Sequence, residues 1–422
     1  MENWQQNYDE LKNYIKEHPS IEITPGVVVM PGDVRPGFYR LFDKVRAAFV
    51  EEKHPTLLAE ASQLSAAFAT AKAEITARLS LKEVIVNSYL TDLLQNPAEG
   101  VTRPLFEPLF ALLQGKTNIE EFEQTAPDLV ETSAKTLLHR GYIHWTALSL
   151  IKLLAPDYAH QVLVTDETLQ QDLPSMHTRP GWYTEELPPL SVAERLPLDF
   201  SQYTVFLVPR VILHSGLLNA FAAISTDFHE VYFKAKELDE HLEWYSIEEI
   251  RRKFGKGDLW PDMVLVLGDE AENLRLAADY FHIARPNVLV DVMESGDWYQ
   301  AGGLEKIKRH KEILKPKLGA FVVCRQPVPQ AAIDELEPPP PSVEAANPAA
   351  EGGDQPLPVA DAAPAVSAVE PCHDIHLLNV GYDASALQPI VEAMRQWRTI
   401  GKYDQYVRPA DMPDGWRTGV YD

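Results

Sequence analysis

Two aspartates lie beside or inside apolar runs. Asp262 follows Pro261 at the head of the run Met263–Leu267, and Asp291 lies within the run Val288–Met293. A buried carboxylate costs free energy unless a cation or hydrogen-bond donors compensate it. Mg²⁺ takes one or two protein carboxylates and completes its shell with water and phosphate oxygens. If the two runs are neighbouring strands, Asp262 and Asp291 are candidate metal ligands.

Each aspartate also has a structural interpretation. Asp262 suits the first position of a strand, and Asp291 could pair with a neighbouring Lys or Arg or face solvent on an edge strand. The sequence leaves both interpretations open.

The motifs around these aspartates follow one another in a particular order. A Pro-Asp strand comes first, then the strand Pro286-Asn-Val-Leu-Val-Asp-Val292, a lysine-bearing helix and the strand Ala320–Cys324. This order resembles the PD-(D/E)XK nuclease fold, and it is closest to the Uma family of restriction-endonuclease-like proteins. The resemblance covers about residues 258–325.

The resemblance implies a nuclease that cleaves DNA with Mg²⁺ held by Asp262 and Asp291. Met293 stands two residues after Asp291, where the family motif has its lysine. The resemblance therefore assigns the lysine role to Lys306 or Lys308, which would stabilise the charge that develops on the phosphate. Because Met293 cannot activate a water and the family's further acid has no clean counterpart, a catalytically degenerate member of this fold is the other expectation.

The charge of the chain limits how it could meet DNA. The sequence has 62 Asp and Glu against 38 Lys and Arg, a formal net charge of −24. Such an excess repels polyanions at long range and argues against a broad nucleic-acid or anionic-membrane surface. Two local basic patches remain, at Glu305–Lys317 and Arg251–Lys256. The candidate DNA contacts are Lys306, Lys308, Arg309 and Lys311 of the first patch.

A second candidate function is a non-catalytic, Rossmann-like protein that binds a ligand or a protein partner. The turn after Val208 contains neither GxGxxG nor GxxxxGK[ST], so we expect no dinucleotide or P-loop site of the usual kind.

Two other clusters do not predict a site. Cys372, Asp374 and His376 would share one face of a strand, but the outer two would stand about 13 Å apart at roughly 3.3 Å per residue. One ion cannot bind both. His214 and Ser215 are adjacent, which does not suit a hydrogen-bonded base and nucleophile, and no orienting acid is evident.

The cysteines and the apolar runs indicate the cellular compartment in which we expect the protein. Cys324 and Cys372 are the only cysteines, too few for a disulfide framework, so we expect a reducing compartment. The N-terminus lacks the apolar core of a signal peptide, and no apolar run is long enough to cross a membrane. We therefore expect a cytoplasmic protein without a membrane partner.

The spacing of apolar residues predicts two halves. Residues 1–156 show three- and four-residue spacing, which predicts an all-α domain, with Asn118 capping a helix that ends at Gly141. Residues 157–202 are expected to form a connector. An α/β domain with five or six strands in a parallel or mixed sheet is expected at 203–336.

The C-terminal part is expected to complete that sheet after an interruption. Residues 337–371 contain nine prolines, six acidic residues and no basic or aromatic residue. This composition predicts a disordered tether. Residues 372–400 are expected to supply a last strand and helix, and 401–422 a polar tail.

The expected strands are Thr204–Val208, Val231–Glu237, Met263–Leu267, Val288–Met293, Ala320–Cys324 and Ile375–Val380. The expected helices of this half are Leu217–Ile224, Ile247–Phe254, Ala271–His282, Leu304–Leu314 and Ser385–Trp397.

Overall fold

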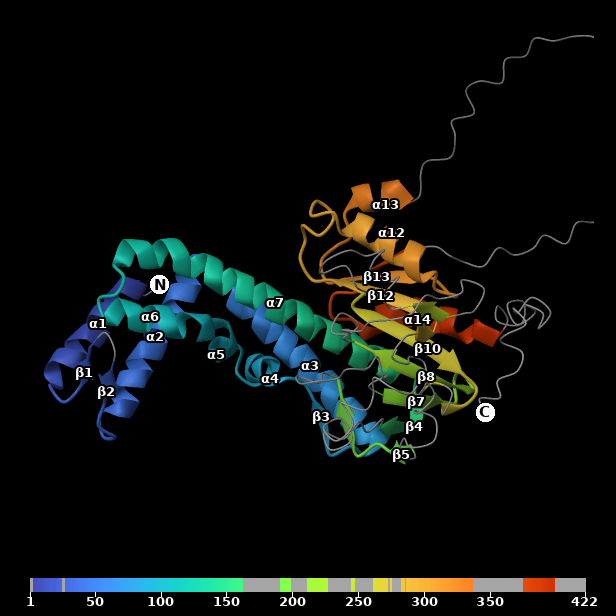
Figure 1. Cartoon of the computed structure of the whole chain (residues 1–422), viewed down its shortest axis with the longest axis horizontal. Helices are drawn as coiled ribbons and strands as arrows, with labels where there is room; N and C mark the ends of the chain where they lie inside the picture. The colour runs from blue at the N-terminus through green and yellow to red at the C-terminus, as the bar shows by residue number, and fades with distance from the viewer. Residues whose placement is uncertain are drawn as a thin grey trace, which may run out of the picture.

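The structure is a computed structural model of the whole chain. It describes residues 3–24, 27–161, 190–198, 211–226, 244–246, 261–271, 274, 282–284, 286–336 and 375–398. A helical arm comes first and leads into a sheet covered by helices (Figure 1). The helices of the arm are α1 (Trp4–Glu17), α2 (Arg35–Lys53), α3 (Leu57–Leu79), α4 (Ser88–Gln95), α5 (Pro97–Thr102), the 3₁₀ turn η1 (Arg103–Leu105), α6 (Phe106–Leu113) and α7 (Ile119–Leu153).

The arm forms because apolar residues recur every three or four positions and face one another. Phe38, Phe42, Val45 and Phe49 of α2 are all buried, as their spacing predicts. Trp4 of α1 packs edge-on against Phe49, with ring centroids 5.4 Å apart. The helical reading of this region is confirmed.

The helix α7 starts as predicted but ends later. The Asn118 side chain accepts from the Glu121 amide, and the Glu121 side chain accepts from the Asn118 amide, which makes a capping box. The expected end at Gly141 is wrong, because α7 continues to Leu153. Gly141 is a packing position: a Cβ there would lie 2.6 Å from Leu64 Cδ2 of α3.

The first 156 residues also contain short strands. The segment around residues 21–30 forms the antiparallel pair β1 (Glu22–Ile23) and β2 (Val28–Val29). The strand β3 (Glu83–Ile85) was not expected, and it pairs in parallel with β6 (Arg195–Pro197). The region is helical with two small β additions.

The second half is built on one mixed sheet of eight described strands. Its order is β14-β13-β12-β10-β8-β7-β4-β5. The pairs β12–β13 and β13–β14 are parallel and the other pairs are antiparallel. The strands are β4 (Pro156–Gln161), β5 (Ser191–Val192), β7 (Val211–Ser215), β8 (Ala220–Ser225), β10 (Met263–Gly268), β12 (Val288–Met293), β13 (Ala320–Cys324) and β14 (Ile375–Asn379). A separate antiparallel pair is formed by β9 (Trp244–Ser246) and β11 (His282–Ala284).

Several expected elements of this half are confirmed. The strands at 263, 288, 320 and 375 and the helix α12 (Gly303–Leu314) lie within a residue or two of their expected bounds. The expected last helix is the 3₁₀ turn η3 (Ala384–Leu387) followed by α14 (Gln388–Arg395). The parallel-or-mixed alternative is resolved in favour of a mixed sheet.

Two expectations differ from the structure. The expected helix Leu217–Ile224 is instead a turn and the strand β8, with Asn219 in the left-handed region at φ 47°. An apolar run this short does not distinguish the two periods. The expected connector, 157–202, contributes β4, β5 and β6, so the sheet begins at the end of α7.

Other expected elements lie outside the described residues. They are Thr204–Val208, Val231–Glu237, Ile247–Phe254, most of Ala271–His282, and the segments 337–371 and 401–422.

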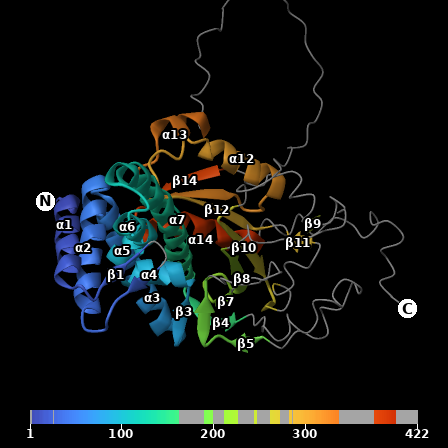
Figure 2. The same cartoon turned by 60° about the vertical axis from the view of Figure 1, so that its left-hand side comes forward.

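Helices cover both faces of the sheet (Figure 2). On one face Leu304 and Ile307 of α12 pack with Met293 of β12, and α13 (Gln330–Leu336) lies beside them. On the other face α7 and α14 share a core with Val290 and Val292 of β12. The side chains of β12 therefore alternate between a face toward α12 and a face toward α7.

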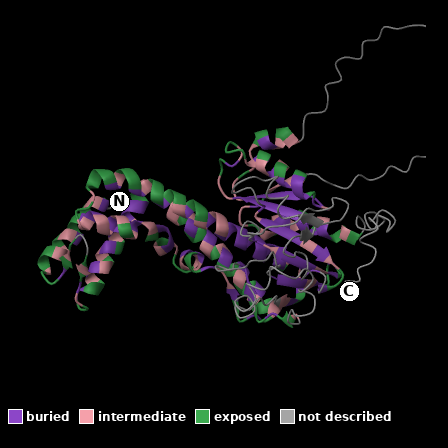
Figure 3. Cartoon of the chain, viewed as in Figure 1, coloured by how far each residue is buried: buried purple, intermediate pink, exposed green. Residues whose placement is uncertain are grey.

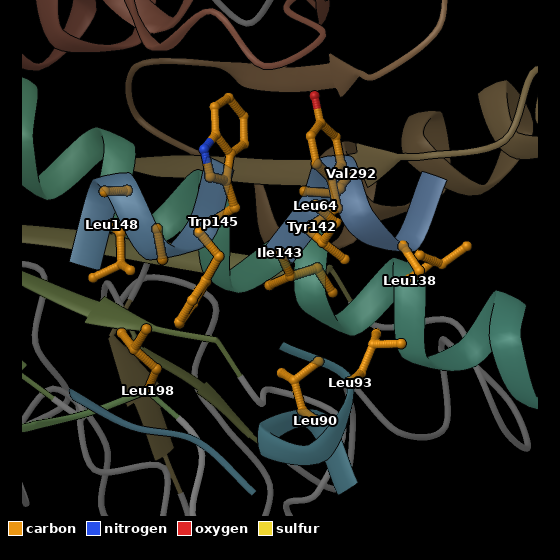
Figure 4. Packing of buried hydrophobic residues seen from close by; sticks show 14 of the residues in the cluster. Leu64, Leu90, Leu93, Leu138, Tyr142, Ile143, Trp145, Leu148, Leu198 and Val292 are labelled. Carbon is orange, nitrogen blue, oxygen red and sulfur yellow. The ribbon is translucent and has the colours of Figure 1, made fainter. Parts of the chain in front are cut away.

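The arm and the sheet share one continuous hydrophobic core. Tyr142 and Trp145 of α7 point toward the strand layer that holds Val292 (Figure 4), and their rings stack 5.3 Å apart. The Tyr142 hydroxyl donates to the Gly381 carbonyl at 2.6 Å. Figure 3 shows the central strands almost entirely buried. The long helix α7 thus fixes the arm to the sheet.

Candidate functional site: the fork between β10 and β12

The two aspartate-bearing strands are antiparallel neighbours. Met263 pairs with Val290 and Leu265 with Val288, after which β12 runs on beyond the start of β10. There the Asp262 Oδ2 accepts a hydrogen bond from the Val292 amide at 2.7 Å. We call the place where the strands part the fork. It is lined by Asp262, just before β10, and by Glu294, just after β12.

A histidine of α7 occupies the fork. His139 Nε2 lies 3.2 Å from Asp262 Oδ1, and His139 Nδ1 lies 2.8 Å from Glu294 Oε2. Both ring nitrogens of a histidine donate only when it is protonated. The geometry is that of an imidazolium held between two carboxylates.

The pKa values of the fork follow from this geometry. Burial lowers the pKa of His139, but the charges and hydrogen bonds of Asp262 and Glu294 outweigh it and raise that pKa to about 10. Burial raises the pKa of Asp262, but His139, with a smaller effect from Lys306, outweighs it and lowers that pKa to about 2. Around neutral pH the histidine is therefore cationic and Asp262 anionic.

Arg325 ties a second helix to the same place. Its Nε donates to the Glu294 carbonyl at 2.9 Å, and its Nη2 lies 2.9 Å from Glu60 Oε2 of α3. The arm thus contacts the fork directly through His139 of α7, and Glu60 of α3 is linked to it through Arg325.

Asp291 does not lie in the fork. Its side chain faces α12, where His310 Nδ1 lies 3.0 Å from Oδ2 and 2.9 Å from Oδ1. Both side chains are fully buried. Because Asp262 contacts α7 and Asp291 contacts α12, the two carboxylates lie on opposite faces of the sheet. The structure does not bring the two expected metal ligands together.

The residues present do not fit the Mg²⁺ that the resemblance implies. Both Asp262 oxygens already accept hydrogen bonds, and Asp291 is enclosed beneath α12. Across the described ranges, no group of three or more His, Cys, Asp or Glu side chains could hold a metal ion. The magnesium expectation has no support in this geometry.

The basic patch on α12 is partly neutralised. Lys308 pairs with Glu305 at 3.1 Å and with Glu335 of α13, and Glu335 also accepts from the Tyr299 hydroxyl at 2.7 Å. Lys306 and Lys311 are half-buried and Arg309 is exposed. DNA contact through Lys306, Lys308, Arg309 and Lys311 stays a prediction.

The structure places a carboxylate beside His214 that the sequence did not predict. Its Nδ1 lies 2.9 Å from Asp157 Oδ2, on the neighbouring strand β4. The Ser215 hydroxyl donates to the Leu154 carbonyl at 2.5 Å, so it serves the fold and not as a nucleophile. His376 stacks on Phe321, while Cys372 and Asp374 lie outside the described residues.

Sequence reasoning missed His139 and Glu294. His139 lies inside a long helix pattern and carries no local signal. Glu294 lies two residues after Val292, so it shares the face of the sheet that meets α7. This two-residue spacing from Val292 is the one sequence signal that could have predicted the place of Glu294.

Comparisons with known proteins add no assignment: no protein-family model, no curated protein and no solved structure matches the chain. None of the helices in the described part is long and apolar enough to cross a membrane.

Proposed function

We propose that this protein is a non-cleaving binding protein whose α/β half has a strand order like that of the PD-(D/E)XK nucleases. The proposal is supported by the order of β10, β12, α12 and β13 along the chain, in which β10 pairs antiparallel with β12 and β12 pairs parallel with β13. The acid at the head of β10 is present, but it binds α7.

The observation that carries the proposal is His139 between Asp262 and Glu294. A nuclease of this type needs carboxylates that converge on a divalent cation. Here the His139 imidazolium of α7 lies between the two carboxylates of the fork, and Asp291 pairs with His310 on the other face. The charged groups of the fork therefore hold the helix α7 against the sheet.

A protein is favoured over DNA as the partner. The net charge of −24 opposes approach to a polyanion, and Lys308 is paired with two glutamates. The binding role therefore does not require the α12 patch to contact phosphates.

A cleavage assay tests the proposal. Plasmid and single-stranded DNA are incubated with the full chain in Mg²⁺ or Mn²⁺, beside Asp262→Asn and Asp291→Asn. We expect no metal-dependent cleavage by any of the three. Cleavage by the wild type that is lost in either variant would overturn the proposal.

Metal titration gives an independent measurement. With Mn²⁺ as the probe, paramagnetic resonance of the wild type is expected to show no saturable site. A saturable site that disappears in Asp291→Asn would show that the acids converge after all, and the binding-only proposal would fail.

A further inference from the structure

We propose that β14 is an interface between two copies of this chain, which join edge to edge across a two-fold axis. This inference does not depend on the chemistry of the fork. It starts from β14, which ends the described sheet next to α12 and α13 (Figure 2).

The two ends of the sheet differ in how they are protected. At one end β5 has only two residues, and a very short strand is a poor template for another chain. At the other end β14 has five residues and no partner strand on its outer side within the described sheet. The inner neighbour β13 is fully buried, whereas every residue of β14 is half-buried or exposed.

The backbone of β14 presents a regular set of groups to the outside. The Val380 amide donates to the Cys324 carbonyl of β13. Because alternate residues of a parallel strand bond the same neighbour, His376 and Leu378 also turn their backbone groups toward β13. The backbone groups of Ile375, Leu377 and Asn379 therefore point away from the sheet.

A groove runs along this edge. It has a volume of about 960 Å³, and all five residues of β14 line it. Its walls include Ile333 and Leu336 of α13 and Pro389 of α14. The Lys308 and Glu335 ion pair holds α13 to α12, so the wall is in place before an added strand arrives.

The charge of β14 favours a second copy as the occupant. The strand reads Ile-His-Leu-Leu-Asn and has no Lys, Arg, Asp or Glu, although the chain as a whole has 62 acidic residues. Antiparallel pairing about Leu377 sets Ile375 opposite Asn379 of the second copy and His376 opposite Leu378. No like charges then face each other across the strands.

Symmetry is the second reason to expect another copy of the chain at this edge. Every copy of the chain has the same β14 edge, which no other described strand covers, so an isologous pair covers both edges with one interface. Pairing through Ile375, Leu377 and Asn379 uses the outward N–H and C=O groups of both strands at once. The product is one sheet that continues across the two-fold axis.

The solution mass tests the inference. Sedimentation velocity of the full chain is expected to give twice the 47.4 kDa of one chain. Asn379→Pro removes an outward N–H without touching the bonds to β13, whereas the matched Asn379→Ala keeps that N–H. Two ladder hydrogen bonds are lost in the proline dimer, so we expect it to be roughly tenfold weaker or more.

The thermal midpoint of both variants checks that each is folded. A wild type that sediments as a monomer at all concentrations would overturn the inference. So would a dimer that is equally stable with Asn379→Pro.

Cross-linking tests the register. In the Cys372→Ser background, Leu377→Cys places each new thiol opposite its own copy, at about the 5.5 Å Cα separation that a disulfide accepts. Oxidation is expected to give a covalent dimer. Leu217→Cys, an exposed position in the turn before β8, is the matched control and should stay monomeric. Equal cross-linking of both variants would overturn the proposed register.

Discussion

His139 and Asp262 are 123 residues apart in the chain, and their side chains meet at 3.2 Å in the fork. His139 belongs to α7, the long helix of the arm, and Asp262 is the residue just before β10. This contact turns an acid that the sequence assigns to metal chemistry into a docking point for a helix. Its consequences can be measured through stability and pH.

Replacing His139 by Gln should destabilise the fold by about 3 kcal/mol, because it leaves Asp262 and Glu294 facing each other without a cation. The measurement is chemical denaturation at several pH values. Lys135→Ala, an exposed change one turn earlier on α7, is the control, and it should cost less than about 1 kcal/mol.

The pH dependence of that difference follows from the two pKa shifts. His139 has a folded pKa of about 10 against 6.5, so its contribution is complete below pH 6.5 and is lost as pH rises toward 10. Asp262 has a folded pKa of about 2 against 3.8, so its contribution is complete above pH 3.8 and is lost as pH falls toward 2. The gap between wild type and His139→Gln should be largest between pH 3.8 and 6.5. A gap that grows from pH 7 to pH 10 would contradict this account.

Asp291 and His310 should behave as a buried pair. Asp291→Val alone should cost about 3–5 kcal/mol, because it leaves His310 without its carboxylate in a fully buried site. The double change Asp291→Val and His310→Leu removes both polar groups and should recover most of that loss. Denaturant midpoints of the two single variants and the double variant measure the coupling. Strictly additive losses would show that the two side chains do not act together.

Gly141→Ala should destabilise the protein, although alanine is the better helix former. A Cβ there would lie 2.6 Å from Leu64 Cδ2 and 3.3 Å from Leu90 Cδ1. Overpacking of this kind costs about 1–3 kcal/mol, more than the roughly 1 kcal/mol gained in helix propensity. Thr132→Ala, exposed on the same helix, is the control for propensity alone. A rise in the thermal midpoint for Gly141→Ala would contradict the packing argument.

The C-terminal residues should be needed by the sheet, whereas the segment before them should not. Deleting 372–397 removes β14 and α14, whose Ile390, Val391 and Met394 are fully buried. We expect loss of cooperative unfolding, measured by calorimetry. Deleting 337–371 should leave the thermal midpoint nearly unchanged, as its composition predicts. A folded 372–397 deletion would show that the sheet does not depend on its last strand.

The sequence by itself determined two kinds of element: those with a clear pattern of apolar residues and those whose ends carry a capping residue. The amphipathic arm, the cap at Asn118 and the apolar strands at Met263, Val288 and Ala320 all follow from local rules of spacing and capping. The predictions for the short run at Leu217 and for Gly141 were wrong. A short apolar run does not distinguish helical from strand spacing, and a glycine inside a helix can serve packing without ending the helix.

Only the tertiary structure decided what the acids do. Asp262 and Asp291 are similar in sequence terms, since each is a carboxylate beside an apolar strand. Strand alternation and the placing of α7 and α12 on opposite faces give them different histidines as partners. His139 reaches the fork from another part of the chain, and no local pattern encodes such a contact. Chemistry at a site depends on distances across the fold, and spacing along the chain does not fix those distances.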